Sequence, residues 1–503
     1  MIEIRLRNQE TFPWINFNDC IYIRGYFYDK NNKVLNENIL YKNLSHISCQ
    51  SDLVKFLKKI DGCFSIIILI KNRNTAIIAS DRIRSFPIFY FIYDRKIFIC
   101  DHIEKNDTNF NKNSLSYFEF LHCGYVSGSE TLIDKIYQIQ AGECISLDEK
   151  GISLKKYYSY INKNNTLNDL DFYKKKLQYA LEQTFSKLIE STKNRFLIIP
   201  LSGGLDSSLI THYLSEVSSE KVKTFSIGFE DYSFDETNYA NIISKYFDTD
   251  HNFEIFSESK MFELLPKIWK NMDEPFADPS LLPTFLLSNF TNQQVKVSLC
   301  GDGADEIFAG YPTYLAHKIT SLIPRQLHGL INKISFLLPV KHRNMSFDFK
   351  LRQFSRGLRY ERQERHQYWL GSFKNNEKQK NYTKHFKDTL SNHNNLTKII
   401  KQNFNELKDW EINLEQDFNF YLTDDMLVKI DRTSMANSLE VRVPYLDHNI
   451  VEFMVKCPSK LKYRGLTSKY LLKQLAKKYL PKKVVNRSKK GFGIPIAKWF
   501  CGS

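Results

Sequence analysis

Short apolar runs separated by polar turns characterise residues 1–160. The runs are rich in β-branched and aromatic side chains, as strands usually are, and turn residues such as Tyr93-Asp94-Arg95 lie between them. Consecutive short strands of this kind predict an antiparallel sheet or sandwich. The expected strands are 21–27, 64–69, 75–79, 86–93 and 96–100.

A polar stretch at 162–166 interrupts this pattern and predicts a domain boundary. Helical periodicity follows, because Tyr173, Leu177, Leu181 and Leu188 fall on one face. From Arg195 onward, β-type runs at 196–199, 222–227 and 295–299 alternate with helical patterns, and residues 320–430 are mostly of helical pattern. Alternation of this kind indicates an α/β domain with a mainly parallel sheet. We therefore expect two domains, 1–160 and 168–503.

The composition is that of a globular protein and does not identify a function. The apolar fraction of 42% and the charged fraction of 25% are ordinary for a globular protein. The start of the chain lacks the pattern of a signal peptide, and runs such as 64–70 are too short to span a bilayer. The nine cysteines contain no CxxC pair. This pattern predicts a cytoplasmic protein with reduced thiols, no structural zinc and no membrane span.

The net charge of +15 is concentrated at one end of the chain. From Lys456 onward there are fourteen Lys and Arg residues and no Asp or Glu, which leaves +15 − 14 = +1 for the rest. Such a stretch can bind nucleic acid, a membrane surface or nucleotide phosphates, or it can be a solvated face. No helix-turn-helix, zinc-finger or RNA-binding signature is present, so we expect no nucleic-acid partner.

A strand, a turn of small residues and a helix follow one another around residues 196–214. The turn contains Ser202, Gly203, Gly204, Asp206 and Ser207, and it precedes a helical apolar pattern. Backbone N–H groups in such a turn, together with the helix N-terminus, bind phosphate, and an aspartate there can hold a divalent cation. No Gly-Lys-Ser/Thr follows, so this is not the kinase-type phosphate loop. It resembles the S-G-G-x-D-S pyrophosphate loop of enzymes that cleave ATP between the α and β phosphates.

A second acidic turn follows the strand at 295–299. Asp302, Asp305 and Glu306 stand within six residues of one another, beside Gly301 and Gly303. Carboxylates this close usually share a cation or a proton, although a solvated helix cap is the alternative. Asp206 and Asp305 together can complete a magnesium site, because magnesium keeps several waters and needs few protein ligands.

Three further segments carry candidate chemistry. Asp273, Glu274 and Asp278 lie in a proline-rich loop, where a structural role is favoured over contact with metal or substrate. Glu440 stands in an apolar run, where it can serve in acid–base chemistry or pair with Arg442 or Arg432. Lys489 precedes a glycine-rich turn, a suitable place from which to reach a phosphate or a developing oxyanion.

These segments, in this order, resemble the asparagine synthetase family over nearly the whole chain. The motifs are S-G-G-L-D-S-S at 202–208, D-E-P-F-A-D-P at 273–279, G-D-G-A-D-E at 301–306, L-E-V-R-V-P-Y-L-D at 439–447 and S-K-K-G-F-G at 488–493. The resemblance implies a pyrophosphate-loop (adenine nucleotide α-hydrolase-like) α/β synthetase domain. It follows a degenerate glutaminase-like α+β sandwich of the N-terminal-nucleophile (Ntn) type.

The resemblance also implies a role for each matching residue. Asp206 and Asp305 match the magnesium ligands, and Lys489 matches a lysine proposed to stabilise the transition states. Asp302 stands where β-lactam synthetases carry a tyrosine, and Glu440 matches the glutamate that partners that tyrosine. ATP would contact Leu201, Ser202, Gly203, Gly204, Leu205, Asp206, Ser207 and Ser208, with the backbone of Ile227, Gly228, Cys300 and Gly301 framing adenosine.

The chain departs from the family at both ends. The family glutaminase uses an N-terminal cysteine, whereas position 2 is Ile2 and the first cysteine is Cys20. The segment before Asp61 is also short, so loops that bind glutamine are expected to be missing. We therefore expect no glutamine hydrolysis, an arrangement similar to β-lactam synthetases and lasso-peptide cyclases. The chain stops at Ser503 within a helical pattern, which indicates a truncated chain or a minimal variant.

The sequence thus predicts an ATP- and magnesium-dependent, amide-forming carbon–nitrogen ligase. Asp302 or Glu440 would accept the proton of the attacking amine. Aspartate with ammonia is the first substrate pair. The runner-up is a peptide or other molecule that supplies its own amine, and a sugar acid is a third possibility. A non-catalytic binding module is disfavoured by the intact acidic residues and Lys489. The resemblance implies a homodimer.

Overall fold

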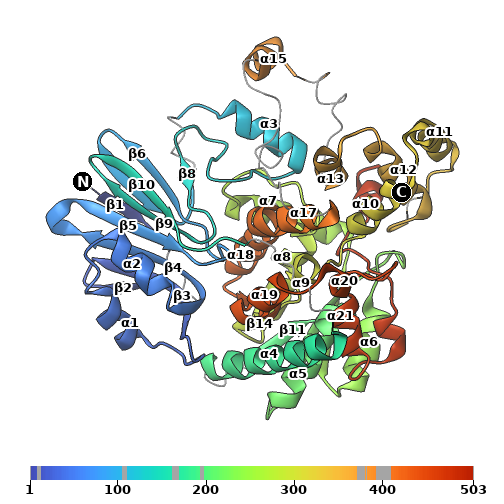
Figure 1. Ribbon diagram of the computed structural model, residues 1–503, viewed down its shortest axis with the longest axis horizontal. Coiled ribbons are helices and arrows are strands. Elements are labelled where there is room, and N and C mark those ends of the chain that lie inside the picture. The colour runs from blue at the N-terminus through green and yellow to red at the C-terminus, as the bar shows by residue number, and fades with distance from the viewer. Residues whose placement is uncertain are drawn as a thin grey trace.

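The computed structural model describes residues 2–7, 13–104, 110–160, 169–192, 197–341, 343–370, 380, 382–391 and 409–501. Figure 1 shows a strand-rich N-terminal unit beside a larger, helix-rich C-terminal unit. The polar stretch expected to form the domain boundary lies outside the described residues. Each unit has its own sheets, as the α/β fold class expected from the sequence requires.

The N-terminal unit is built on an antiparallel sheet with strand order β10-β9-β5-β4-β3-β2. Ile66 to Ile70 is continuously apolar because both faces of this sheet are covered. Ile66 points towards α1 (Glu37–Leu44) and α2 (Gln50–Leu57), whereas Ile67 points to the opposite face. The strands are β2 (Ile15–Phe17), β3 (Ile21–Asp29), β4 (Ile60–Ile70), β5 (Thr75–Ser80), β9 (Glu143–Asp148) and β10 (Gly151–Lys156).

A second sheet, of order β1-β7-β6-β8, packs on the face that carries Ile67. Ile78 and Ile145 from the first sheet meet Tyr90 and Ile99 from the second in one buried layer. The expected sandwich is therefore confirmed, with the helices on its outer face making it α+β. The bounds of its strands are β1 (Ile2–Arg5), β6 (Phe89–Tyr93), β7 (Lys96–Cys100) and β8 (Tyr137–Gln138). The same unit also contains η1 (Lys71–Arg73), between β4 and β5, and α3 (Ser114–Cys123), between β7 and β8.

The C-terminal unit contains a sheet of order β13-β12-β11-β14-β15, in which every neighbouring pair is parallel. Its carboxyl ends therefore share one edge, where ligands of open α/β sheets bind. Its strands are β11 (Leu197–Pro200), β12 (Lys223–Phe229), β13 (Asp250–Phe256), β14 (Val297–Leu299) and β15 (Glu440–Arg442). The first, second and fourth of these coincide with the strands expected from sequence.

Helices surround this sheet and supply most of its core. Leu177 and Leu181 of α4 pack in one core with Leu209 and Ile210 of α5, as the helical periodicity predicts. The helices before the acidic turn are α4 (Leu170–Ser191), α5 (Leu205–Val217), α6 (Thr237–Tyr246), α7 (Glu258–Asn271) and α8 (Leu281–Asn292).

The described part of 320–430 is mostly helical, as expected. In the described residues no helix is long and apolar enough to cross a membrane. The remaining helices are α9 (Ala304–Phe308), α10 (Pro312–Leu322), η3 (Arg325–Leu327), α11 (His328–Leu337), α12 (Phe347–Gly357), α13 (Arg362–Leu370), α15 (Lys384–Ser391), α17 (Asp409–Gln416), η4 (Asp417–Met426), α18 (Leu427–Met435), η5 (Pro444–Leu446), α19 (His448–Val455), α20 (Ser459–Lys462), α21 (Tyr470–Ala476), α22 (Lys482–Val485) and α23 (Ile496–Cys501).

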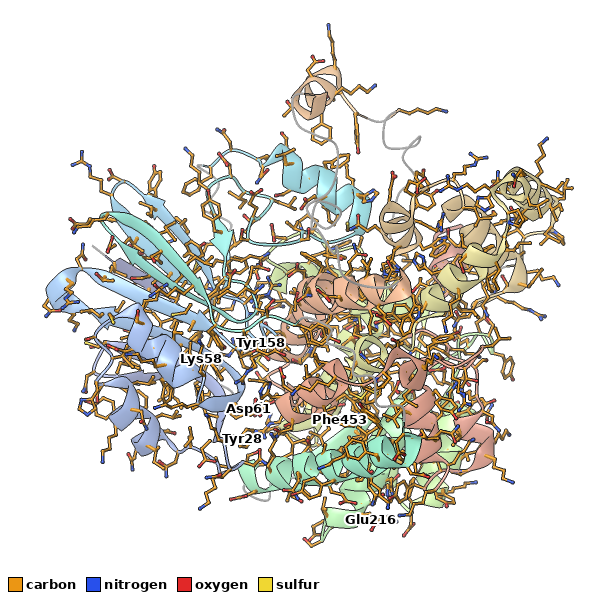
Figure 2. All side chains as sticks on the ribbon, in the orientation of Figure 1. Tyr28, Lys58, Asp61, Tyr158, Glu216 and Phe453 are labelled. Atoms are coloured by element: carbon orange, nitrogen blue, oxygen red, sulfur yellow. The ribbon has the colours of Figure 1, made fainter. Side chains whose placement is uncertain are left out.

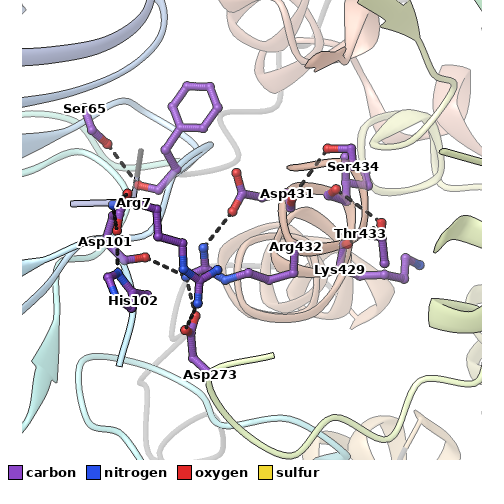
Figure 3. Close-up of polar contacts among 12 residues, drawn as sticks. Arg7, Ser65, Asp101, His102, Asp273, Lys429, Asp431, Arg432, Thr433 and Ser434 are labelled. Carbon is purple, nitrogen blue, oxygen red and sulfur yellow. Dashed lines mark hydrogen bonds and ion pairs between the residues drawn. The ribbon is translucent and has the colours of Figure 1, made fainter. Parts of the chain in front are cut away.

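A buried network of charges joins the two units (Figure 3). Arg432 of α18 donates to the backbone oxygen of Asp101 at 3.0 Å and to its neighbour Asp431 at 3.0 Å, and it forms an ion pair with Asp273. Arg24 of β3 lies 3.9 Å from Asp431 and 4.0 Å from Asp101. Because these groups are buried, each charge depends on its partners for compensation.

A second ionic contact ties β4 to α4. Asp61, labelled in Figure 2 between the two units, lies 3.2 Å from Lys187 and 3.3 Å from Arg82. Lys187 also pairs with Asp447, and the hydroxyl of Tyr28 donates to Ser191 at 2.9 Å. The N-terminal unit is thus fixed against α4 and α18, two helices of the C-terminal core.

The change Arg432→Gln tests the buried network. It leaves Asp273 and Asp431 without their common cation, so we expect the free energy of unfolding in urea to fall by about 3–5 kcal/mol. Arg325→Gln is the matched control, because Arg325 forms only an exposed pair with Glu361 at 3.6 Å. A loss for Arg432→Gln no larger than for the control would contradict this role.

Candidate active site

The loop between β11 and α5 has the geometry of an anion cradle. Gly203 adopts φ +63°, and a Cβ there would lie 2.2 Å from the carbonyl carbon of Tyr239. Gly204 is the N-cap residue that directly precedes α5, and it has no side chain to cap the helix. The N–H of Gly204 itself donates to Ser202 Oγ at 3.2 Å. The N–H groups of the first turn of α5 are therefore available to a ligand.

A cavity of about 460 Å³ opens at the carboxyl edge of the parallel sheet. Nine of the twelve residues expected around the nucleotide line it, and the exceptions are Gly203, Ser208 and Gly228. Among the expected catalytic and metal residues, Asp302, Asp305 and Lys489 also line it. The nine are Leu201, Ser202, Gly204, Leu205, Asp206, Ser207, Ile227, Cys300 and Gly301.

Two lysines hold the two expected metal ligands together. Lys469 Nζ lies 2.6 Å from Asp206 Oδ2 and 2.8 Å from Asp305 Oδ1, and Lys489 Nζ lies 2.7 Å from Asp305 Oδ2. Burial raises the pKa of Asp305, but the two ammonium groups outweigh it and hold that pKa well below its ordinary value. Asp305 is therefore ionised and available to a cation or to a phosphate-bound metal.

These residues fit a magnesium–nucleotide complex. Asp206 Oδ1 and Ser208 Oγ are buried and accept or donate no hydrogen bond within the described structure. In the described ranges no three His, Cys, Asp or Glu residues gather into a metal cluster. Two carboxylates are nevertheless enough where phosphate oxygens and waters complete the coordination of magnesium.

Lys469 was not singled out by the sequence. It adopts φ +50°, and Gly310 permits its approach, since a Cβ there would lie 2.1 Å from Lys469 Cε. The available signal was the basic stretch after Lys456, because Lys469, Lys473, Arg487, Lys489 and Lys490 all line the cavity. The structure thus places part of this stretch where it can meet nucleotide phosphates.

The cavity is also lined by another buried cation, Lys429. Lys429 of α18 donates to Ser280 Oγ at 2.7 Å and lies 3.0 Å from Asp278 Oδ2. Burial lowers the pKa of Lys429, but Asp278 and Asp302 more than compensate and raise it above its ordinary value. Asp302 and Lys429 therefore both contribute charge to the lining of the cavity.

Glu440 does not line this cavity. It forms an ion pair with Arg442 at 2.6 Å, which is one of the alternatives left open by the sequence. Leu439 and Val441, its neighbours in the chain, do line the cavity, whereas Glu440 lines a small separate pocket beside Cys63. Side chains alternate along a strand, so Glu440 and Arg442 share the face turned away from the nucleotide loop.

The proline-rich loop divides between the cavity and the domain interface. Asp278 faces the cavity, whereas Asp273 joins the buried network and Glu274 accepts a hydrogen bond from the N–H of Leu132. Burial, reinforced by Asp273, raises the pKa of Glu274 to about 7. All three acids of the loop therefore have partners within the protein, and only Asp278 among them lines the cavity, where it pairs with Lys429.

Comparison with known proteins identifies the family. The model of the family described as "Asparagine synthase" matches residues 189–503, and that of the "Glutamine amidotransferase domain" matches residues 46–158. The chain therefore belongs to the asparagine synthase family and is an asparagine synthetase-like ligase.

Three relatives match this chain over different shares of its length. Asparagine synthetase [glutamine-hydrolyzing] 1 of Bacillus subtilis (strain 168) is 27% identical over 98% of this chain and 76% of its own length. A putative asparagine synthetase of Mycobacterium tuberculosis (strain ATCC 25618 / H37Rv) is 29% identical over 78% of this chain and 59% of its own. Microcin J25-processing protein McjC of Escherichia coli is 25% identical over 54% and 52%, respectively.

Glu274→Gln tests the buried carboxyl group at the interface. Its pKa rises from 4.5 to about 7 on folding, so the folded state holds more protons between these values. The stability contributed by Glu274 is therefore complete below pH 4.5 and is lost as the pH rises through about 7.

Glutamine mimics the protonated form and still accepts from Leu132. We expect the urea midpoint of Glu274→Gln, relative to the parent, to increase between about pH 5 and about pH 8. Glu220→Gln, at an exposed position, controls for the loss of a carboxylate. A midpoint difference that stays constant with pH would contradict the assignment.

Proposed function

We propose that the protein is an ATP- and magnesium-dependent amide-forming ligase that adenylates a carboxylate and transfers the acyl group to an amine. The observation that carries this proposal is the cluster of Asp206, Asp305, Lys469 and Lys489 in front of α5. ATP supplies the leaving pyrophosphate, and magnesium neutralises its charge. A cluster of this kind favours pyrophosphate release because its charges are already oriented.

The position of each residue in the cavity indicates its role in the proposed reaction. The N–H groups at the start of α5, with Ser202 and Ser207, bind phosphate oxygens, and Asp206 and Asp305 hold the metal. Lys469 would turn from the two carboxylates to the pyrophosphate once the metal binds. Lys489 would neutralise charge that develops first at phosphorus and then at the acyl oxygen. Ile227, Cys300 and Gly301, which line the cavity, would frame adenosine, whereas Gly228 does not line it.

We assign the proton of the attacking amine to Asp302 rather than to Glu440. Asp302 lines the cavity, whereas Glu440 is buried in its pair with Arg442. Transfer to Glu440 would cost the energy of that buried ion pair. Lys429 lines the same cavity as Asp302 and is suited to orient a second carboxylate of the substrate, as an aspartate-like substrate would provide.

We further propose that the amine does not come from glutamine. Within the described N-terminal unit, burial raises the pKa of Cys63 and of Cys144 to about 12, which disfavours a thiolate nucleophile. The other cysteines of this unit, Cys20, Cys49, Cys100 and Cys123, have their nitrogens in peptide bonds in this sequence. Ammonia or a substrate amine remains. The similarity to McjC, over about half of each chain, makes a peptide with its own amine the second candidate.

Lys489→Ala and Lys469→Ala test the cluster. Each removes one ammonium group from the developing charge, so we expect pyrophosphate release to fall about 100- to 1,000-fold. Lys477→Ala, an exposed lysine just after α21, should retain the parent rate. Pyrophosphate would be measured with a coupled enzymatic assay across candidate carboxylates. Parent-like rates in both active-site variants would refute the proposal.

The amine source is tested by mass spectrometry of the product. Reactions would contain ammonium, glutamine labelled at the amide nitrogen, or no added amine. We expect product with ammonium or with no added amine and no transfer of label from glutamine. Labelled amide in the product would contradict the proposed absence of glutaminase chemistry and leave the ligase assignment intact.

A further inference from the structure

Helices α11 and α12, with the turn between them, form a surface hairpin of unusual composition. We call residues 328–357 the apolar hairpin, and Figure 1 shows both helices at the outer edge of the C-terminal unit. Residues 312–359 around it contain nine Lys and Arg residues and one acid, Asp348. The basic residues are Lys318, Arg325, Lys333, Lys341, Arg343, Lys350, Arg352, Arg356 and Arg359.

Helix α11 buries polar residues and exposes apolar ones. Its buried residues are Asn332 and Ser335. Leu330, Ile334 and Leu337, at helical spacing, are exposed, and Leu337 is 83% accessible. A helix that packs on a globular core shows the reverse pattern. The outward stripe of α11 therefore packs on no core formed by the described residues.

Helix α12 has the same inverted pattern. Asp348, Ser355 and Gly357 are buried, whereas Phe347 is 73% accessible and Phe349 is also exposed. The two helices meet through polar contacts: Ser335 Oγ lies 2.8 Å from Ser355 Oγ, and Arg352 Nε donates to the backbone oxygen of Ser335 at 3.1 Å. Small and polar residues between helices, with apolar residues outside, are typical of helices in an apolar surrounding.

Size and charge limit what can cover this surface. Each helix of about ten residues is roughly 15 Å long, half of what a bilayer core requires, so the hairpin cannot span one. A second copy of the chain would bring the same excess of positive charge against itself. The favoured occupant is therefore both apolar and negatively charged.

We propose that the apolar hairpin docks on the surface of a phospholipid membrane that carries anionic head groups. Leu330, Leu337, Val340, Phe347 and Phe349 would enter the boundary between head groups and acyl chains. The surrounding lysines and arginines would contact lipid phosphates, each strengthening the binding. This proposal is independent of the chemistry assigned to the cavity.

Docking would bring one rim of the active-site cavity close to the membrane. The N–H of Asn344, in the turn of the hairpin, donates to Ser233 Oγ at 3.1 Å. The backbone oxygen of Ser233 accepts from Lys490 Nζ at 3.3 Å, and Lys490 lines the cavity. The docked protein would thus present its active site next to the lipid surface.

Flotation with lipid vesicles tests this proposal on the purified chain. Vesicles of phosphatidylcholine alone would be compared with vesicles of equal parts phosphatidylcholine and phosphatidylglycerol. We expect binding to the anionic vesicles that weakens as salt is added. The double change Leu337→Asp/Phe347→Asp should abolish it, and Lys333→Gln/Lys341→Gln should weaken it at least about tenfold. Leu154→Asp, at an exposed leucine of β10, is the matched control and should bind like the parent.

Circular dichroism would verify that each variant is folded. If Leu337→Asp/Phe347→Asp does not fold, Lys333→Gln/Lys341→Gln, which changes two exposed side chains, still tests the proposal. Absence of binding to anionic vesicles by the folded parent would overturn the proposal. So would binding that both hairpin variants retain. A parent dimer in sedimentation that Leu337→Asp/Phe347→Asp converts to monomer, without vesicle binding by the parent, would assign the surface to a second copy instead.

Discussion

Two carboxylates at the carboxyl edge of a parallel sheet are held in place by two ammonium groups, and the candidate chemistry depends on this compensation. Asp206 and Asp305 come from different strand–helix turns, and Lys469 contacts both. Without these cations, burial would favour the protonated form of Asp305. With the lysines present, Asp305 stays ionised and close to Asp206, so a metal–nucleotide complex would meet an arranged set of charges.

The rest of the fold positions these four groups. All strands of the C-terminal sheet are parallel, so β11 and β14 deliver their turns to one edge. The N-terminal unit supports the part of the cavity lined by Lys429, because Arg432 and Lys429 lie one helical turn apart on α18. Arg432 is held by Asp101 and Asp273 at the domain interface, whereas Lys429 faces the cavity. The unit that matches the glutamine amidotransferase domain is thus connected to the cavity through α18.

Sequence reasoning located the site where local signals are strong. The strand, small turn and helix around Ser202–Ser208 and the acidic turn at 301–306 depend on neighbouring residues, and both line the cavity. Lys469 could not be found in this way, because its contact with Asp206 spans 263 positions and requires Gly310 to lack a side chain. The partner of Glu440 was left open, although the period of two in L-E-V-R-V already placed Glu440 and Arg442 on one face.

The central claim is that this protein cleaves ATP between the α and β phosphates to activate a carboxylate. The most direct test is to identify the nucleotide product by chromatography after incubating the protein with ATP, magnesium and candidate carboxylates and amines. The account predicts AMP, formed in equal amount with pyrophosphate and only when magnesium is present. ADP and inorganic phosphate as the products would contradict it.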